Sequence, residues 1–365
     1  MYSAFKFQEV KDFCEKIFSC YGFNEEESRT ITDVLLRADL WGIESHGMQR
    51  MIRYHREITS GMVSVSAVPE IVHETPVSAV IDAGKCIGQT VGVRGMRMAI
   101  EKAKKSGVGM VTVRNSNHYG IAGYYADMAI QEDLMGISMT NSEAIVVPLF
   151  GSHAMLGTNP IAVGFPADPV SFMFDASTSV VTRGKVEVYN KLEKPLPDGW
   201  AVDTKGHVTH DANEVLHNII NKLGGGIAPL GGTSEMYGGH KGYGFGILAE
   251  ICTAILSSGV TSNYVATKPG ENNIAHFFMA VDYGIFGDKG SIKASFSKFL
   301  RELRESPKSE GQSRIYTHGE KEHESTLEKL EKGIPIIDKT EAEVRKIAEY
   351  HNVPFTLKGV PCEHQ

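Results

Sequence analysis

The stretch of sequence that decides the fold is GVGMVTVRNSNHYGIAGYYADMAIQEDLMGISMTNS, residues 107–142. It opens as an apolar run typical of a buried strand and passes into a polar loop near residue 118. A helical pattern then covers residues 121–136, and a second short strand follows at 137–142. Strands that alternate with helices in this way indicate a sheet covered by helices. The stretch therefore predicts an α/β architecture.

The neighbouring segments extend the same alternation. Upstream, residues 71–84 read as two strands with a turn, and residues 92–107 read as a helix with basic residues in its last turn. Downstream, residues 145–290 are rich in Gly and Pro with short apolar strands, and residues 242–259 form a clear helical pattern. The α/β part is thus expected to fill the middle of the chain.

Both ends of the chain read as helical. Apolar residues at helical spacing predict helices over 5–21, 24–42 and 45–59, and Asn24 is expected to cap the second. Near the C-terminus, a helix is predicted over 340–352, opened by a capping box of Thr340 and Glu343. The charged stretch 301–333 is expected to be an ordered surface segment, and residues 357–365 to be frayed.

Composition excludes several function classes. The 365 residues are 42% hydrophobic and 22% charged, with a net charge of −7, so the long basic stripe of a nucleic-acid-binding protein is absent. The five cysteines are odd in number and show no C-x-x-C spacing, which favours free thiols in a reducing compartment. The first residues resemble neither a signal peptide nor a membrane span. We therefore expect a cytoplasmic protein that binds neither nucleic acid nor membrane.

The segment GIESHGMQRMIRYHR, residues 42–56, carries the first group of reactive side chains. His46, Arg50 and Tyr54 stand four residues apart, so one helix would present all three on one face. Imidazole exchanges protons near neutral pH, and guanidinium holds a carboxylate through two parallel hydrogen bonds. The trio is suited to reading a 2-hydroxy acid. On the pattern alone, an ordinary solvated helix face is the favoured interpretation.

A second group lies in the loop after the strand at 107–113. His118 follows the polar residues Asn115, Ser116 and Asn117, at a place where α/β folds present ligand sites. A helix-capping loop with an exposed histidine explains the same pattern equally well.

Three further segments combine small polar residues with glycine: residues 139–166, 174–185 and 238–246. Their hydroxyls, backbone amides and cations are suited to phosphate or ribose, although ordinary turns explain each pattern as well. Neither G-x-G-x-x-G after a strand nor G-x-x-x-x-G-K-[ST] occurs. His207, His210 and His217 match no ligand spacing, so no metal site is predicted.

Taken in chain order, these segments resemble one family, the malate/L-lactate dehydrogenases of the non-Rossmann type. Six stretches carry the resemblance: ADLWGIESHGMQRMIRY, VRNSNHYGIAGYYADMA, MLGTNPIAVGFPA, FDASTSVVTRGKVEVY, LPDGWAVDTKG and GGHKGYGFGILAEI. The resemblance implies a non-Rossmann nicotinamide-binding α/β domain at 71–294. It also implies a mainly helical domain built from residues 1–70 and about 295–365, and a homodimer with its active site between the domains.

The resemblance also implies roles for individual residues. His118 and His46 are the acid/base candidates, with His118 preferred, and Arg50 binds the substrate carboxylate with Tyr54 alongside. The residues implied to contact the cofactor, which is NAD or alternatively NADP, are Ser142, Asp175, Ala176, Ser177, Lys241, His318, Gly319 and Glu320. The insertion GGGIAPLGGTSEMYGG, residues 224–239, is longer and richer in glycine than the family pattern and puts the placement of Lys241 in question.

The sequence therefore predicts an NAD(P)-dependent oxidoreductase that moves a hydride between nicotinamide and a small 2-hydroxy or 2-keto acid, with malate and oxaloacetate as the expected pair. One alternative is a reductase of another keto acid or cyclic imine acid, such as lactate, ureidoglycolate, diketogulonate or piperideine carboxylate. An alternative from another class is a metal-dependent hydrolase or lyase that uses the histidines.

Overall fold

A seven-stranded mixed sheet forms the centre of the protein, whose structure is a computed structural model that describes residues 1–363. In sheet order its strands are β2 (Glu70–Glu74), β3 (Ser78–Asp82), β4 (Val108–Ser116), β10 (Ile274–Val281), β5 (Met135–Thr140), β6 (Ile161–Phe165) and β7 (Phe172–Ala176). Only β3 and β4 run parallel; every other neighbouring pair is antiparallel. A Rossmann sheet is mostly parallel, so the predicted non-Rossmann α/β fold is confirmed.

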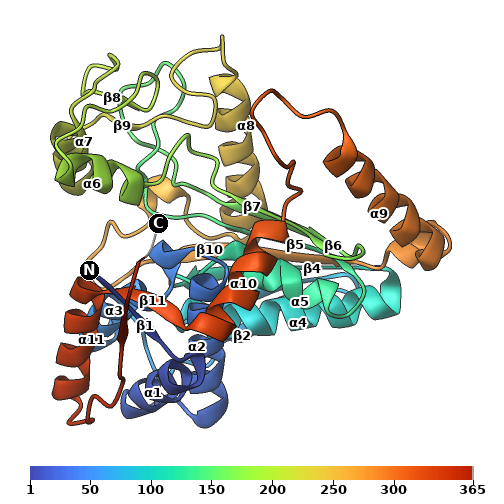
Figure 1. Cartoon of the computed structure of the whole chain (residues 1–365), viewed down its shortest axis with the longest axis horizontal. Helices are drawn as coiled ribbons and strands as arrows, with labels where there is room; N and C mark the ends of the chain where they lie inside the picture. The colour runs from blue at the N-terminus through green and yellow to red at the C-terminus, as the bar shows by residue number, and fades with distance from the viewer. Residues whose placement is uncertain (364–365) are drawn as a thin grey trace.

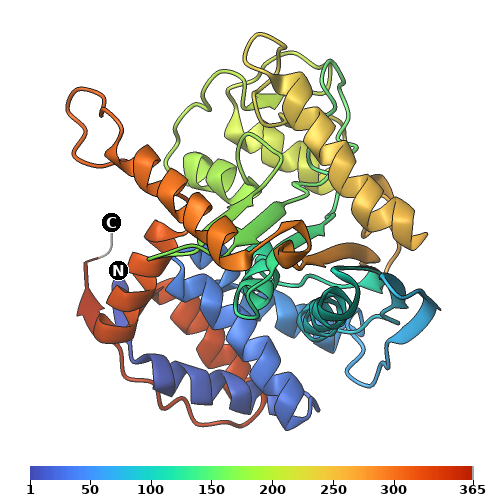
Figure 2. The same ribbon diagram turned by 90° about the vertical axis from the view of Figure 1, so that its right-hand side faces the viewer.

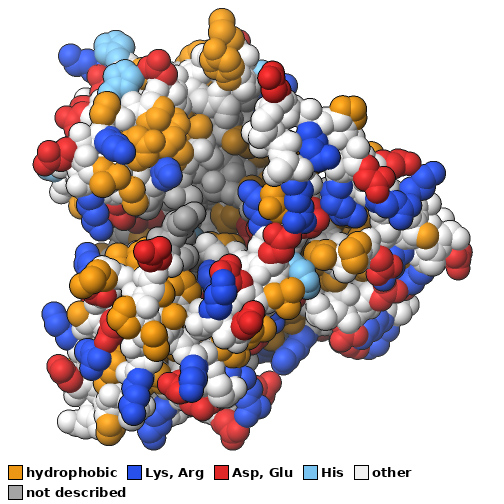
Figure 3. Space-filling model, in the orientation of Figure 1, with side chains coloured by type: hydrophobic (Ala, Val, Ile, Leu, Met, Phe, Trp, Pro, Cys, Tyr) orange, Lys and Arg blue, Asp and Glu red, His pale blue; other side chains and the backbone are white. Residues whose placement is uncertain are grey.

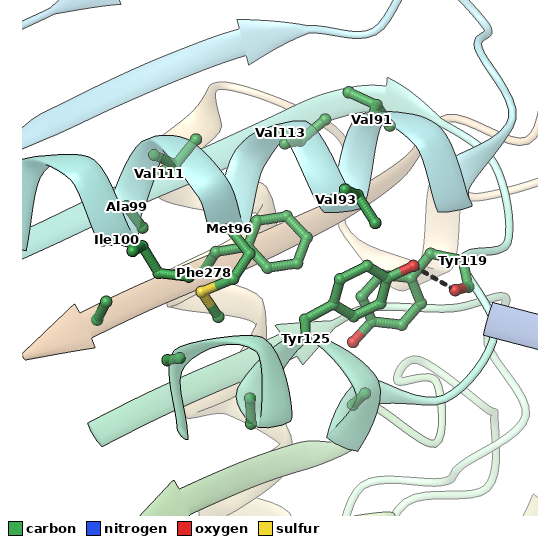
Figure 4. Packing of buried hydrophobic residues seen from close by; sticks show 14 of the residues in the cluster. Val91, Val93, Met96, Ala99, Ile100, Val111, Val113, Tyr119, Tyr125 and Phe278 are labelled. Atoms are coloured by element: carbon green, nitrogen blue, oxygen red, sulfur yellow. Dashed lines mark hydrogen bonds between the residues drawn. The ribbon is translucent and has the colours of Figure 1, made fainter. Parts of the chain in front are cut away.

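Helices cover both faces of this sheet (Figure 1). Helices α4 (Gly88–Ser106) and α5 (Ala122–Ile130) pack on one face, while α8 (Gly239–Glu250) and the π-helix η3 (Ile251–Ile255) lie on the other. Figure 4 shows the core under α4, where Met96, Val113, Tyr125 and Phe278 pack together. Burying such side chains stabilises the fold by about 1.5–3 kcal/mol each. This packed core fixes β4 and the loop that follows it.

The two chain ends meet in a second, three-stranded antiparallel sheet. Its strands are β11 (Ile334–Ile337), β1 (Tyr2–Phe5) and β12 (Val360–Cys362), in that order. Four helices lie beside it at the lower left of Figure 1: α1 (Phe7–Cys20), α2 (Glu25–Leu40), α3 (Met51–Thr59) and α11 (Asp338–Tyr350). Helix α10 (Glu320–Lys332) lies nearer the middle of that view and contacts α2 and β11. The domain boundaries near residues 70 and 295 stay a prediction.

Two details of the C-terminal prediction are wrong. Helix α11 begins at Asp338 directly after β11 and its N-cap residue Ile337 makes no side-chain cap, so Thr340 and Glu343 form no capping box. The tail predicted to be frayed pairs with β1 through β12, although the last two residues of that call lie outside the described range. In both cases strand pairing with the distant N-terminus decides the local structure.

The middle of the chain also builds a small lobe away from the large sheet, at the upper left of Figure 1. It contains α6 (Arg183–Lys191), α7 (Ala212–Asn221) and the pair β8 (Ala201–Val202) and β9 (Gly226–Ile227), around its own apolar core. The 3₁₀-helix η4 (Ser262–Tyr264) follows η3. The face of the molecule is hollowed beside this lobe (Figure 3). The lobe therefore forms one wall over the site described below.

The charged segment 301–333 is ordered, as expected. The 3₁₀-helix η5 (Tyr283–Phe286) leads into α9 (Lys289–Glu305), which projects from the body and buries only Leu300 (Figure 2). Helix α10 then returns to the chain ends. Among residues 1–363, no helix is long and apolar enough to cross a membrane.

Candidate active site

The segment 45–59 is not the continuous helix that its spacing predicts. It forms two 3₁₀ turns, η1 (Glu44–His46) and η2 (Met48–Arg50), and becomes α-helical only at Met51. Gly47, with φ −88° and ψ −141°, separates the turns. His46 and Arg50 therefore stand on different turns, and the prediction of one shared helix face is wrong.

A buried carboxylate from the preceding helix causes the break. The side chain of Asp39 fills the space beside Gly47, where a Cβ would lie 1.9 Å from its Oδ1. Asp39 accepts a 2.8 Å hydrogen bond from the backbone N–H of Met48, and burial raises its pKa to about 7. Lys329 of α10 donates to the backbone oxygen of Asp39 at 2.6 Å. The C-terminal part of the chain thus helps to fix the turn that carries His46.

The structure brings His46, Tyr54 and His118 together. The hydroxyl of Tyr54 lies 2.9 Å from Nδ1 of His118, and the His46 and His118 rings stack with centroids 5.5 Å apart. The backbone N–H of Gly120 donates to the same Nδ1 at 3.3 Å. While Gly120 donates, Nδ1 is the acceptor and Nε2 carries the proton; in the other tautomer Nδ1 donates to the Tyr54 hydroxyl oxygen and Nε2 is the nitrogen that can accept a proton. This leaves Nε2 for a ligand.

A buried network of hydrogen bonds fixes the loop residues that precede His118 in the sequence. Asn117 donates to the backbone oxygens of Lys85 and Cys86 at 3.0 and 2.9 Å, and its own Oδ1 accepts from Asn272 at 2.7 Å. Asn272 also donates to Glu57 of α3 at 3.3 Å. Hydrogen bonds in a buried network strengthen one another and limit the movement of the segments that they join. The loop after β4 is thereby connected to the helix that carries Tyr54.

The electrostatic environment keeps both imidazoles neutral. Burial lowers the pKa of His118 well below its usual value, and the charges of Arg53, His46 and Arg50 lower it further. Burial, followed by Arg50 and Arg53, lowers the pKa of His46 to about 3. A bound anion would offset the guanidinium charges and raise both values. The site is therefore suited to an acidic substrate.

Arg50 lies on the edge of this group, facing the small lobe. It is half-buried, and its Nε donates to the backbone oxygen of Ser45 at 2.5 Å. Burial and Arg53 lower its pKa, and Glu187 and Arg183 of α6 also act on it. Those two residues form an ion pair of 3.0 Å with each other. Arg50 therefore lies near α6, across the hollow beside the small lobe.

Ser142 belongs to a chain of hydrogen bonds that links three of the predicted segments. Its hydroxyl accepts from the backbone N–H of Thr158 at 3.1 Å, and the backbone oxygen of Thr158 accepts from the backbone N–H of Thr178 at 2.8 Å. The oxygen of Thr178 then accepts from Leu230 at 2.9 Å. Hydroxyls and amides therefore meet in one place beside the start of α8, a donor set suited to ribose and phosphate groups.

Asp175 connects this patch to the His118 loop. One of its oxygens accepts a 2.7 Å hydrogen bond from the backbone N–H of Gly123, at the start of α5. Burial raises its pKa to about 6, although that hydrogen bond opposes the change. Ala176 follows at the end of β7, and the Ser177 hydroxyl donates to the backbone oxygen of Ser179 at 3.3 Å. The carboxylate thus joins the segment that contains Thr178 to Gly123 of α5, five residues after His118.

The remaining predicted cofactor residues are more peripheral. Lys241 lies exposed in the first turn of α8, while the 224–239 insertion packs tightly beneath, so that a Cβ on Gly242 would lie 2.1 Å from the oxygen of Leu230. The segment at 318–320 runs along the edge of β7, where the oxygen of His318 accepts from Met173. The carboxylate of Glu320 is engaged by the N–H of Thr317 at 2.6 Å and by Arg314 at 2.8 Å.

Two residues near the site were missed by sequence reasoning. Arg53 lies close enough to His118 to act on its pKa, and it bonds Glu57 at 2.7 Å. Glu250 is a buried carboxylate of α8 that accepts from Asn159 at 2.8 Å and also from Asn141 and Ser262. In the sequence, the signal for Glu250 was a single acidic residue within the apolar run GILAEICTAIL. A buried carboxylate without hydrogen-bond donors around it costs free energy, so donors were to be expected there.

The fold and this group of side chains define an α/β enzyme equipped to exchange a proton with an anionic substrate. The sequence matches the family described as malate/L-lactate dehydrogenase over residues 5–345. A malate dehydrogenase of Pyrococcus abyssi is 43% identical over 341 residues, which cover 93% of this chain and 92% of that protein. A malate/(S)-sulfolactate dehydrogenase of Methanothermus fervidus is 35% identical over 353 residues, 96% of this chain and 98% of that protein.

The solved structures agree. The crystal structure of a malate dehydrogenase from Entamoeba histolytica superposes with a TM-score of 0.93 at 36% identity, covering 98% of this chain and all of that one. The chain therefore belongs to the malate/L-lactate dehydrogenase family, as its motifs predicted, and it is a dehydrogenase. The comparisons give no support to the metal-dependent hydrolase or lyase considered above.

Proposed function

We propose that this enzyme uses NAD to oxidise a small 2-hydroxy acid and to reduce the corresponding 2-keto acid, with malate and oxaloacetate as the preferred pair. The observation that carries the proposal is the contact of His118 with Tyr54 and His46, next to Arg50. The nicotinamide, when bound, accepts or supplies the hydride at the substrate C2. The residues of this chain bind and orient the acid and move its hydroxyl proton.

His118 is the proposed base. In the oxidation it takes the substrate hydroxyl proton, and in the reduction its imidazolium returns a proton to the carbonyl oxygen. General acid–base catalysis of this kind contributes about 10²–10⁴-fold. Tyr54 and Gly120 fix the ring through Nδ1. The stacked ring of His46 supports the substrate oxygen or substitutes for His118 in this role.

Arg50 is the proposed carboxylate binder, since a planar guanidinium orients a carboxylate through two hydrogen bonds. Arg53 provides a second guanidinium that acts on His118. Glu57 already pairs with Arg53 at 2.7 Å. The preference for malate over lactate therefore rests on the malate dehydrogenases that are 43% identical to this chain, and sulfolactate is the next candidate.

The cofactor is proposed to lie over the hydroxyl patch of Ser142, with Asp175, Ala176 and Ser177 on the side of the histidines. Lys241 and residues 318–320 would hold its outer parts. NAD is preferred to NADP in this proposal because one relative, a ureidoglycolate dehydrogenase of Escherichia coli that is 28% identical over 323 residues, is named for NAD(+). The continuous hydrogen bonds from Ser142 to Leu230 support this placement.

The enzyme is also proposed to be a homodimer in the cytoplasm. Helix α8 and η3 expose a row of large apolar side chains, 38–57% accessible, on the outer side of the molecule: Phe245, Ile247, Leu248, Ile251, Ile255 and Leu256. A helix that is apolar all round is normally covered. The occupant we propose is the same helix of a second copy. All five cysteines are free, as a reducing compartment requires.

The test is an activity matrix on the purified enzyme. NADH and NADPH oxidation would be measured with oxaloacetate, pyruvate, sulfopyruvate, diketogulonate and piperideine carboxylate. We expect the highest kcat/KM with NADH and oxaloacetate. A clear preference for pyruvate would overturn the choice of malate and oxaloacetate, and a preference for the cyclic imine acid would replace the proposed substrate class. A preference for NADPH would overturn the choice of NAD as cofactor.

A further inference from the structure

Glu250 is a buried carboxylate that forms no ion pair with any of residues 1–363. It is the last residue of α8 and is 5% exposed. Its oxygens accept from neutral groups: Nδ2 of Asn159 at 2.8 Å, Nδ2 of Asn141 at 3.4 Å, and the backbone N–H and the hydroxyl of Ser262. Burying a charge without a cation costs free energy, and a leucine would suit this apolar helix without that cost. Packing alone therefore does not explain the carboxylate.

The donors around Glu250 come from three other segments of the chain. Asn141 follows β5, Asn159 precedes β6, and Ser262 begins η4. Asn159 is fully buried and has a φ of 35°, in the left-handed region that residues other than glycine adopt uncommonly. Such a conformation persists only where the surroundings fix it. Glu250 thus ties α8 to the end of β5 and to the segment that leads into β6.

Asn159 connects the carboxylate to Ser142. Its Oδ1 accepts from the backbone N–H of Ser142 at 3.2 Å, while its Nδ2 donates to Glu250 and, at 3.3 Å, to the backbone oxygen of Gly246. A backbone N–H only donates and a carboxylate only accepts, so the Asn159 amide has a single orientation. Gly157 packs against both side chains, since a Cβ there would lie 2.3 Å from Oγ of Ser142 and 2.6 Å from Oδ1 of Asn159. Ser142 is therefore fixed from two sides.

The hydroxyl of Ser142 keeps a proton that it can donate. Its oxygen accepts from the backbone N–H of Thr158 at 3.1 Å, and the Thr158 hydroxyl lies at the long distance of 3.5 Å. A hydroxyl group has one proton and two lone pairs. With one lone pair occupied by the Thr158 N–H, the Ser142 proton is available to an oxygen of a bound ribose or phosphate group.

We infer that Glu250 is a positioning residue for the cofactor: through Asn159 it fixes Ser142 in the orientation that meets the cofactor. The hydrogen bonds run from Ser142 through Asn159 to the carboxylate, and every group keeps its own proton. Glu250 itself is occupied by donors of the chain and acts only through these neighbours. The inference rests on the proposed function, which puts the cofactor over Ser142.

The experiment measures the dissociation constant of NADH by fluorescence titration for Glu250→Gln and Asn159→Asp. Glutamine keeps the shape of Glu250 but replaces one oxygen with an NH2 group, which then faces other donors. Asn159→Asp instead puts a second carboxylate against Glu250. We expect the dissociation constant of each single variant to rise about 10- to 100-fold, because buried polar groups are left unsatisfied in both.

The double variant Glu250→Gln/Asn159→Asp reverses the hydrogen bond between the two positions. The glutamine NH2 can donate to the new aspartate, which still accepts from the backbone N–H of Ser142. Because residues in contact have non-additive effects, we expect NADH to bind at least about fivefold more tightly to the double variant than to either single variant. Losses that multiply in the double variant would overturn the inference.

The steady-state kinetics of Glu250→Gln separate positioning from a merely structural role. A loss of folded protein would lower kcat and leave the dissociation constant of NADH unchanged. We expect the opposite: kcat at saturating NADH and KM for oxaloacetate should stay within about threefold of the wild type, since only cofactor binding is weakened. A lower kcat with unchanged NADH binding would assign Glu250 to stability alone.

Ser262→Ala and Ser257→Ala decide the matter if Glu250→Gln does not fold. Both serines are 1% exposed, but the Ser262 hydroxyl contacts Glu250 and Asn159, whereas that of Ser257 donates to the backbone oxygen of Ala254. Ser262→Ala should weaken NADH binding about 3- to 10-fold, the effect of one lost hydrogen bond. Ser257→Ala should bind NADH as the wild type does, and equal affinities of the two variants would contradict the role of Glu250.

The proposed function fails separately. Should the wild type bind neither NADH nor NADPH, both proposals fall together. Should the wild type bind NADH while Glu250→Gln and Ser262→Ala bind it equally tightly, only the role of Glu250 is wrong.

Discussion

At the scale of single residues, the chemistry depends on how His118 is surrounded. Its ring is held at Nδ1 by Tyr54 and Gly120, and it stacks on His46. His118→Ala should lower kcat by about 10²–10⁴-fold, the range for loss of a general base. The dissociation constant for NADH, measured by fluorescence titration, should stay within threefold. Turnover close to that of the wild type would transfer the role to His46.

The proposed carboxylate binder, Arg50, can be tested by changing the shape of its charged group. Arg50→Lys keeps the charge but loses the planar fork, and a point charge replaces a bidentate contact poorly. We expect KM for the keto acid to rise 10- to 100-fold, with a smaller change in kcat. Arg56→Lys, six residues further along in α3 and outside the site, serves as the matched control. A KM unchanged for every acid tested would remove Arg50 from the site.

At the scale of elements, the turn that carries His46 depends on the absence of a side chain at Gly47. Gly47→Ala would place a Cβ 1.9 Å from Oδ1 of Asp39. Overpacking costs about 1–3 kcal/mol, and the displaced turn should lower kcat/KM at least tenfold. Gly290→Ala in α9 is the control, because its nearest atom would be 3.4 Å away. Denaturant unfolding and steady-state kinetics on both variants provide the measurement; equal behaviour would contradict the role of Asp39.

The same turn shows which local predictions succeed. Asn24 and Glu27 are three residues apart and form the cap that begins α2, because every group involved belongs to that helix. His46 and Arg50 have equally good helical spacing, yet the helix between them is broken by Asp39, which comes from a different element. Local patterns predict what local contacts decide. A carboxylate brought in by tertiary packing is invisible to them.

At the scale of the whole molecule, residues 107–142 predict the class of fold but not the order of its strands. Strands β4 and β5 follow one another in sequence, yet β10 lies between them in the sheet, pairing Phe278 with both Val111 and Ser138. The position of β10 in the sheet and the pairing of β1 with β11 and β12 both bring together segments that are far apart in the sequence. The six motifs indicated the family through their order, while their meeting around His118 required the three-dimensional structure.

The buried titratable groups predict how stability depends on pH. Burial lowers the pKa of His276 and of His46 to about 3, and that of His118 well below its usual value, so these histidines charge only on unfolding below pH 6.5. Asp39 and Asp175, with pKa values near 7 and 6, act in the opposite sense, since they hold protons when folded and release them when unfolded.

Between pH 5 and 6 these three histidines therefore bind about three protons in the unfolded state, while the two aspartates bind about two in the folded state. The pKa values of His55 and His351, which burial lowers, act in the same sense as those of the three buried histidines. The difference of one proton makes the free energy of unfolding rise by roughly 1.4 kcal/mol per pH unit across this interval. Denaturant titrations at pH 5.0, 5.5 and 6.0 measure the slope. His276→Gln removes one titrating group and should flatten it, and a free energy that falls as the pH rises to 6 would refute the assignment.

The largest unexplained feature of the isolated chain is the apolar surface of α8 and η3. If a second copy covers it, the wild-type mass in solution should be twice the 39.9 kDa of one chain. Ile255→Glu places a charge within that surface, where Ile255 is 57% exposed, and burying an unpaired charge there should give a monomer at micromolar concentration. Ile220→Glu is the matched control, at 59% exposure on α7, and should remain dimeric.

The dimer also bears on activity, because α8 lies on the large sheet and that sheet carries the His118 loop. We therefore expect the monomer to have a lower kcat/KM as well as a lower mass. Light scattering with parallel kinetics decides the matter: a monomeric wild type, or two variants of equal mass, would exclude α8 as the interface.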